Sequence, residues 1–297
     1  MAQQEKKDSL PEFMEKMAFQ KVKKLIHENA GLNCSGYRDE YLKRRFDIRL
    51  RATGANTYGK YIIYLRNNPE EYKSLLNDLA INFTSFFRDT DVYTYLEKTL
   101  LPKIFLASKP TRIWSAGCAT GEEPYSLAIL VQKVLGRAIA THPVTIYASD
   151  IDKDALTVAA KGEYTQRQLG NMDGASIDQF FTKEGEIFRV NSAVRQLIHF
   201  HEFDLMTPAI HQNLDLILCR NVMIYFSKEG QQQIHMSFYK ALKEGGYFIT
   251  GKSEMLSGEP AIKFLPVDHL VRVYQKTHKA DEPLKMDSFN VSPKLYA

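Results

Sequence analysis

The 297-residue sequence predicts an α/β domain with a mainly parallel sheet, preceded by a small helical bundle. In residues 10–80, apolar residues recur only at helical spacing, whereas after about residue 110 short strand-like runs alternate with helical runs. Residues 161–200 interrupt this alternation with polar turns, short helical stretches and a hairpin pattern. We therefore expect them to form an inserted subdomain.

The composition is that of an ordinary globular chain, with 44% apolar and 25% charged residues. The three cysteines are far apart and form no CxxC pair, so we expect neither a disulfide framework nor a zinc site. No apolar run is long enough to span a membrane, and the first residues are too polar for a secretory signal. A cytoplasmic setting is expected. The net charge of +4 is too small to indicate nucleic-acid binding by itself.

The helical part divides at its glycines and at one proline. The first helix is expected to end at Gly31, the second helix (37–51) is strongly basic and ends at Gly54, and a third covers 58–66. Pro69 is expected to begin a fourth helix, since proline is favoured in the first turn. The apolar face of the first helix contains Phe13, Met14, Met17, Val22, Leu25 and Ile26.

The α/β part contains five expected strands, at 113–115, 144–148, 214–219, 247–250 and 270–274. Helical runs between them include 125–135 and 231–242. The expected divisions are a helical domain (1–80), a linker with a lead-in helix (81–110), the α/β domain (111–279) and a poorly ordered tail (280–297).

The segment 115–126, SAGCATGEEPYS, joins a strand to a helix through a glycine turn, as in nucleotide-binding corners. It has Gly117 and Gly121 but not the three glycines of a dinucleotide fingerprint. Glu122 and Glu123 start the helix, where two carboxylates would repel a pyrophosphate. S-adenosylmethionine suits them better, because it carries a sulfonium and an ammonium group and no phosphate. The alternative is a strand-to-helix turn without a ligand.

Two more strand ends supply polar side chains. Asp150 ends the second strand, where an acid receives ribose hydroxyls in doubly wound folds, although an aspartate there can simply cap a helix. The segment 215–226, DLILCRNVMIYF, places Arg220 and Asn221 near the same edge of the sheet. It lacks the Asn/Asp-Pro-Pro-aromatic turn of methyltransferases that act on exocyclic amino groups. Arg220 and Asn221 could instead cap the next helix, and Tyr225 could pack in the core.

The linker segment 82–88, NFTSFFR, contains three aromatic residues and one arginine. One interpretation is hydrophobic docking of the two domains, with Arg88 exposed. The other places Asn82, Thr84 and Arg88 over the cofactor as a lid.

The motifs NFTSFFR, GCATGEEPYS, SDID and CRNVMIYF, in this order, closely resemble those of the bacterial chemotaxis receptor glutamate methyltransferases, the CheR family. The resemblance covers about residues 13–276. It implies an all-α N-terminal receptor-recognition domain and a class I, Rossmann-like methyltransferase sheet with a small inserted β subdomain. It also implies that S-adenosylmethionine methylates glutamate side chains on the cytoplasmic domain of a chemoreceptor, giving methyl esters and S-adenosylhomocysteine.

The resemblance also assigns site residues. Arg88 and Tyr225 resemble the family's proposed catalytic pair. The basic helix is expected to dock on the receptor through Arg38, Lys43, Arg44, Arg45, Arg49 and Arg51, with a solvated charged face as the alternative. The expected cofactor contacts are Asn82, Thr84, Arg88, Gly117, Glu123, Asp150, Asp204, Leu205, Arg220 and Asn221.

No metal is expected, since His199 and His201 share a strand face but have no third ligand at suitable spacing. No general base is expected either, because a glutamate with a pKa of about 4.3 is already an anion at neutral pH. The chain departs from the family at Lys252, which precedes Ser253-Glu254 where a histidine is common.

A second departure is the hairpin at 182–188, which looks shorter than in members that bind a receptor's C-terminal pentapeptide. Pentapeptide tethering is therefore expected to be absent. Neither a nucleic-acid partner nor direct membrane insertion is expected. Two rival functions stay open: a methyltransferase with another substrate, such as RNA, and a non-catalytic signalling protein that binds S-adenosylmethionine.

Overall fold

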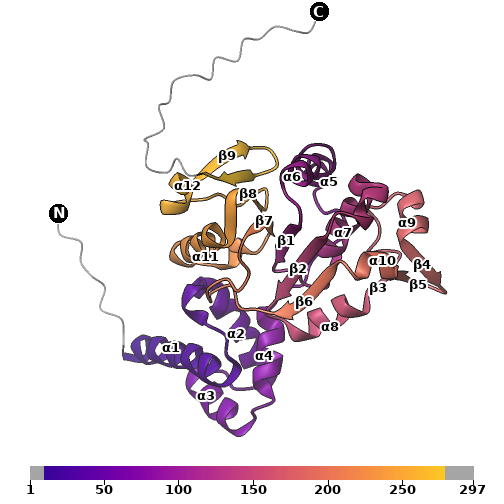
Figure 1. Cartoon of the computed structure of the whole chain (residues 1–297). Coiled ribbons are helices and arrows are strands. Elements are labelled where there is room, and N and C mark those ends of the chain that lie inside the picture. The colour runs from indigo at the N-terminus through magenta and orange to yellow at the C-terminus, as the bar shows by residue number, and fades with distance from the viewer. Residues whose placement is uncertain (1–9, 278–297) are drawn as a thin grey trace, which may run out of the picture.

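The computed structural model describes residues 10–277, so the expected tail lies outside the described residues. A helical bundle sits against the edge of an α/β domain (Figure 1). The bundle contains α1 (Leu10–Ala30), α2 (Asp39–Thr53), α3 (Tyr58–Asn67) and α4 (Glu71–Leu79), with a short 3-10 turn, η1 (Cys34–Gly36), between the first two. A linker then leads through α5 (Thr90–Tyr95), η2 (Leu96–Leu100) and α6 (Leu101–Ala107) into the sheet.

The predicted helix ends in the bundle are confirmed at two glycines. Gly31 and Gly54 have φ angles of 75° and 69°, in the left-handed region that favours glycine. The second helix starts at Asp39 and not at 37, because Tyr37 pairs with Phe226 in an isolated β-bridge. The fourth starts at Glu71, two residues after the expected proline.

Only part of α1 is buried, which corrects the expected apolar face. Val22, Leu25 and Ile26 lie in the bundle core, as does Phe19. Phe13, Met14 and Met17 are instead 51%, 62% and 56% exposed. Helical spacing predicted the helix, but the burial of its first turns depends on whether another element covers them.

Arg49 joins α2 to α4, and a tyrosine of α3 completes the same polar network. Its Nε and Nη2 atoms donate to the two carboxylate oxygens of Glu71 at 2.8 and 2.7 Å, and Nη1 donates to Asp78 at 3.0 Å. The hydroxyl of Tyr61 donates to the same buried glutamate at 2.8 Å. The Arg49 guanidinium is therefore engaged inside the bundle and not at the receptor-docking surface expected for it.

The main sheet has the order β6-β2-β1-β7-β8-β10-β9, in which β10 runs antiparallel to both neighbours and the other pairs are parallel. Renumbered along the chain, this order is 3-2-1-4-5-7-6. Its strands are β1 (Thr111–Ala116), β2 (Val144–Asp150), β6 (Ile198–Glu202), β7 (Leu214–Cys219), β8 (Leu242–Thr250), β9 (Phe264–Asp268) and β10 (Val273–Lys276).

Helices cover both faces of this sheet, and successive side chains of β1 serve opposite faces. Ile113 packs in the core with α7 (Glu122–Leu135), whereas Trp114 packs in the core with α11 (Lys228–Ala241). The other helical elements of this domain are η3 (Gly136–Ala140), α8 (Lys153–Lys161), η4 (Met223–Tyr225) and α12 (Glu259–Lys263). The parallel sheet predicted from the alternating pattern is confirmed.

The inserted subdomain contains a three-stranded sheet of order β3-β5-β4, with strands Glu163–Thr165, Ile187–Val190 and Phe181–Glu184. Two short helices, α9 (Gly174–Phe180) and α10 (Ser192–Arg195), accompany it. The segment expected to be inserted extends to 200, but β6 begins at Ile198 and belongs to the main sheet. The late strand expected at 270–274 proves to be the second arm of the β9–β10 hairpin.

The bundle docks on the α/β domain through aromatic rings and close backbone contacts. Tyr37 lies 4.3 Å from Phe226 and Tyr41 lies 4.9 Å from Tyr225, measured between ring centroids. The backbone N–H of Arg38 donates to the carbonyl oxygen of Tyr225 at 3.0 Å. The bundle is thereby held against the carboxyl edge of the sheet.

We predict that Arg49→Ala destabilises the protein by about 3 kcal/mol, because it leaves the buried Glu71 carboxylate without its cation. Urea unfolding followed by circular dichroism measures the loss. Arg51→Ala is the matched control: it is the same substitution on an exposed arginine of α2 and should change stability by less than about 0.5 kcal/mol. Equal losses in the two variants would contradict the structural role of Arg49.

Candidate active site

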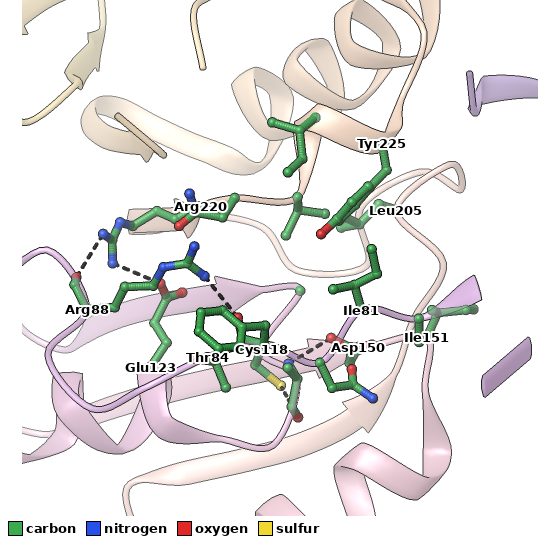
Figure 2. Close-up of a pocket in the computed structure, with 18 of the residues that line it drawn as sticks. Ile81, Thr84, Arg88, Cys118, Glu123, Asp150, Ile151, Leu205, Arg220 and Tyr225 are labelled. Carbon is green, nitrogen blue, oxygen red and sulfur yellow. Dashed lines mark hydrogen bonds and ion pairs between the residues drawn. The ribbon is translucent and has the colours of Figure 1, made fainter. Parts of the chain in front are cut away.

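A cavity opens where the bundle, the linker and the carboxyl edge of the sheet meet (Figure 2). Tyr37 and Leu79 line it from the bundle, and residues 80–85 line it from the linker. The turns after β1, β2 and β7 supply the opposite wall. Ten of the eleven predicted cofactor and catalytic residues line this one cavity: Asn82, Thr84, Arg88, Gly117, Glu123, Asp150, Leu205, Arg220, Asn221 and Tyr225.

The turn between β1 and α7 requires glycine at its first position. Gly117 has a φ of 79°, and a Cβ atom there would lie 2.6 Å from Cγ2 of Val222. The N–H groups of Gly117 and Cys118 donate to the carbonyl oxygen of Ser149 at 2.8 and 2.9 Å. These contacts bring the turn close to the end of β2 and to the turn that follows β7.

Asp150 sits at the end of β2 with its carboxylate held by the backbone. Oδ2 accepts from the N–H of Ala119 at 2.8 Å, and Oδ1 accepts from the N–H of Asp152 at 3.0 Å. Burial raises the pKa of Asp150, and these two N–H groups oppose the rise. Because a carboxylate has about four acceptor positions, it can still accept hydrogen bonds from hydroxyl groups of a ligand.

The two glutamates that begin α7 point in different directions, which corrects the expectation that both face the ligand. Glu123 lines the cavity, where it accepts from the hydroxyl of Ser115 at 2.8 Å. Glu122 is buried away from the cavity lining and accepts from Thr120 and from Gln168 of the inserted subdomain. One carboxylate, not two, therefore faces the cavity from this helix.

Arg220 connects the end of β7 to the linker and to α7. Its side chain is 2% exposed; Nη2 donates to the carboxylate of Asp89 at 2.6 Å and to the carbonyl oxygen of Arg88 at 2.9 Å. Nη1 lies 3.4 Å from Glu123. Burial raises the pKa of Glu123, and Arg220 and the Ser115 hydroxyl oppose the rise. The arginine thus fixes three parts of the cavity wall.

The linker segment 82–88 buries two of its aromatic side chains in the core and also lines the cavity. The hydrophobic-docking interpretation and the cavity-lining interpretation therefore each describe part of this segment. Phe86 and Phe87 are buried in the core, whereas Phe83 is 76% exposed. Arg88 donates to the carbonyl oxygen of Phe83 at 2.9 Å and lines the cavity. Asn82 donates to the carboxylate of Asp152 at 2.6 Å, which anchors the linker beside the end of β2. Thr84 also lies on the lining.

Asp204 does not line the cavity, although its neighbour Leu205 does. Its Oδ2 accepts from the N–H of Asn33 in the bundle at 3.1 Å, and Oδ1 accepts from the N–H of Met206 at 2.9 Å. Asp204 therefore connects the α/β domain to the bundle, and its side chain is not part of the cavity lining.

Tyr225 ends the short 3-10 turn η4 and carries its hydroxyl into the cavity (Figure 2). Its ring packs on Tyr41 of α2. Burial raises the pKa of Tyr225 above its usual value near 10, so the phenol keeps its proton at neutral pH. It can therefore donate a hydrogen bond to a group in the cavity.

The basic residues of α2 and its cap fall into two groups. Arg38, Lys43, Arg44 and Arg51 are exposed. Arg45 is half-buried, with its guanidinium 5.6 Å from the centre of the Tyr41 ring, and Arg49 is engaged with Glu71 and Asp78. Since Tyr41 contacts Tyr225, the exposed charges lie on a helix that borders the candidate site.

Sequence reasoning missed several lining residues. The centre of the Tyr93 ring, in α5, lies 5.5 Å from the Arg220 guanidinium, and the cavity is also lined by Tyr37 of the bundle and Ile81 of the linker. Asp89, the partner of Arg220, directly follows the recognised NFTSFFR motif, so its position next to Arg88 was the available signal.

In residues 10–277, no helix is long and apolar enough to span a membrane, and no three or more His, Cys, Asp or Glu side chains gather as metal ligands would.

The sheet order and the cavity at its carboxyl edge define a class I methyltransferase fold preceded by an all-α domain. Residues 82–269 match the family described as "CheR methyltransferase, SAM binding domain", and residues 17–80 match "CheR methyltransferase, all-alpha domain". The chain therefore belongs to the CheR methyltransferase family, and it is a methyltransferase with a domain that binds S-adenosylmethionine (SAM).

Curated relatives are similar over most of their length. A chemotaxis protein methyltransferase of Listeria monocytogenes is 32% identical over 78% of this chain and 88% of its own. Chemotaxis protein methyltransferase 2 of Pseudomonas aeruginosa is 33% identical over 87% of this chain and 91% of its own. The chemotaxis protein methyltransferase of Escherichia coli is 32% identical over 80% of this chain and 84% of its own. Similarity to these relatives supports SAM-dependent methylation in chemotaxis.

We predict that Gly117→Ala destabilises the protein more than Gly54→Ala does. Both substitutions force alanine into a left-handed conformation, which costs roughly 1–2 kcal/mol. At Gly54 a Cβ would meet no atom within 4 Å, whereas at Gly117 it would also clash with Val222, and overpacking adds about 1–3 kcal/mol. Urea unfolding compares the two variants, and equal losses would show that the turn does not need this close approach.

Proposed function

We propose that this protein transfers the methyl group of S-adenosylmethionine to glutamate side chains on the cytoplasmic helices of a chemoreceptor. The products are glutamate methyl esters and S-adenosylhomocysteine, and the protein acts in the cytoplasm. The observation that carries the proposal is that one cavity is lined by Glu123 and Asp150 together with Arg88 and Tyr225. Membership of the family and the names of its relatives support the chemotactic role.

The residues of the cavity fit SAM. Asp150 would accept hydrogen bonds from the ribose hydroxyls, and the Glu123 carboxylate would attract a cationic part of the cofactor. Gly117, in the turn that follows β1, also lines this cavity. When bound, SAM supplies an electrophilic methyl group on a sulfonium. We propose that catalysis uses no metal, since a glutamate is already an anion at neutral pH.

Arg88 and Tyr225 would orient the glutamate carboxylate. A guanidinium can hold a carboxylate through its planar fork, and the phenol O–H can donate to one oxygen. Neither needs to remove a proton. Alignment and the exclusion of water then contribute most of the rate enhancement, of which positioning can supply about 7–11 kcal/mol. The hold on the carboxylate must stay moderate, because the nucleophile loses its charge in the transition state.

The exposed basic residues of α2 would contact the acidic receptor helix. This helix borders the candidate site through Tyr41 and Tyr225, so a receptor helix bound there would bring a glutamate near the cavity. In the inserted subdomain, β4 and β5 are joined by the two-residue turn Gly185-Glu186. The shortness of this turn supports action without pentapeptide tethering.

We predict that the purified protein transfers label from methyl-labelled SAM to a receptor cytoplasmic fragment, and that alkali releases the label as it does from a methyl ester. The fragment is supplied with and without its C-terminal pentapeptide, and both forms should give similar rates. RNA serves as the competing substrate. Labelled RNA would establish the rival methyltransferase function, and cofactor binding without transfer to any substrate would establish the non-catalytic one.

In the same assay, Arg88→Ala should lower turnover about a hundredfold, a loss expected when a positioning contact to the reacting group is removed. Arg66→Ala, the same change on an exposed arginine of α3, should leave turnover unchanged. Circular dichroism checks that both variants are folded. Turnover by Arg88→Ala at the wild-type rate would refute the assigned role.

Docking on an acidic helix predicts a salt-dependent KM for the receptor fragment. Raising the ionic strength from about 0.01 M to about 0.15 M shortens the Debye length from about 30 Å to about 8 Å, so KM should rise. In the double variant Lys43→Glu/Arg44→Glu, KM should be higher at low salt and respond less to added salt. Arg66→Glu is the charge-matched control on α3. A KM that does not respond to salt in the wild type would exclude electrostatic docking through α2.

A further inference from the structure

Glu254 lies behind the cavity, where it joins the ends of two neighbouring strands. It follows β8 in the turn that begins at Gly251, and it is only 5% exposed. Its Oε2 atom accepts from the backbone N–H of Gly251 at 2.7 Å and from the backbone N–H of Asn221 at 3.0 Å. Asn221 belongs to the turn that follows β7, so one carboxylate oxygen connects the two strand ends.

The turn that Glu254 holds carries two cavity residues. Asn221 has a φ of 61°, in the left-handed region, where a residue other than glycine costs roughly 1–2 kcal/mol. From there the chain continues through η4 to Tyr225. A strained backbone of this kind persists only when surrounding contacts fix it. The hydrogen bond from Asn221 to Glu254 is such a contact.

The space around the carboxylate is closely fitted. A Cβ atom at Gly251 would lie 2.7 Å from Oε2 of Glu254 and 2.8 Å from the nitrogen of Asn221, so the two turns can approach only over a glycine. Burial raises the pKa of Glu254, and the backbone N–H groups of Gly251, Asn221, Ile224 and Met223 oppose the rise. Three of these four groups belong to the turn that leads to Tyr225. The other oxygen, Oε1, is buried without a hydrogen-bond partner among the described residues.

We propose that Glu254 is a positioning residue that fixes the 221–225 turn and thereby holds the Tyr225 hydroxyl at the cavity. The contact that does this is the pair of backbone hydrogen bonds to Oε2, so the length of the side chain matters more than its charge. This inference rests on the proposed function, because it assigns Tyr225 a part in glutamate methylation.

Two conservative variants separate length from charge. Glu254→Asp keeps the charge but is one methylene shorter, so its oxygen cannot reach both N–H groups. Glu254→Gln loses the charge but keeps the length, and its amide oxygen can accept both bonds. We predict that Glu254→Asp lowers kcat for receptor methylation about tenfold, since small misplacements in an active site are costly. The kcat of Glu254→Gln should stay within about threefold of wild type.

A second readout distinguishes positioning from general stability. In the Tyr225→Phe background, Glu254→Asp should lower kcat by less than about threefold, because the group it positions is already gone and coupled sites are not additive. Arg88→Ala is the matched background, in which Glu254→Asp should still lower the residual kcat about tenfold. Circular dichroism confirms folding, and kcat is measured at saturating SAM.

Three results would overturn the inference: a wild-type kcat in Glu254→Asp, a larger loss of kcat in Glu254→Gln than in Glu254→Asp, or an undiminished effect of Glu254→Asp in the Tyr225→Phe background. The first indicates no role, the second a role for charge, and the third a role independent of Tyr225. Failure of the proposed function looks different, because the wild-type protein itself would then not methylate the receptor fragment.

Discussion

The buried guanidinium of Arg220 is the contact on which the rest of the cavity depends. At 2% exposure it meets carboxylates from two other elements, Asp89 before α5 and Glu123 on α7, and it also binds the carbonyl oxygen of Arg88. A buried cation of this kind is tolerated only when it is well paired, and removal of one partner is strongly destabilising. The same ion pairs that neutralise Arg220 therefore hold the linker over the sheet edge and leave Arg88 on the cavity lining.

The second constraint is the close approach of the bundle to the α/β domain. Asp204 binds the backbone of Asn33, and Tyr37 and Tyr225 pack against the cores on both sides of the junction. The cavity has walls from both domains, so it exists only while they are docked. The helix with the exposed basic residues is placed beside Tyr225 by the same contacts. If the proposed function holds, the domain interface couples receptor docking on α2 to the chemistry at Tyr225.

Much of the fold and of the candidate site could be predicted from the sequence. Residues from segments as distant as 82–88 and 220–225 meet because the carboxyl ends of parallel strands converge at one edge of a sheet. Side chains whose direction depends on a tertiary partner could not be predicted. Glu122 turns toward Gln168 of the inserted subdomain, and Arg49 turns toward Glu71. Strand β9 was not predicted; it contains Pro266, which a strand tolerates here because β9 lies at the edge of the sheet.

The central claim is that the cavity between the bundle and the sheet receives the adenosyl cofactor. Isothermal titration of the wild-type protein with S-adenosylhomocysteine tests it most directly, with Asp150→Asn titrated in parallel. We expect saturable binding of one molecule per chain and weaker binding by Asp150→Asn, because a neutral amide replaces the carboxylate offered to the ribose hydroxyls. Absence of binding to the folded wild-type protein, or an affinity that is the same in both proteins, would contradict it.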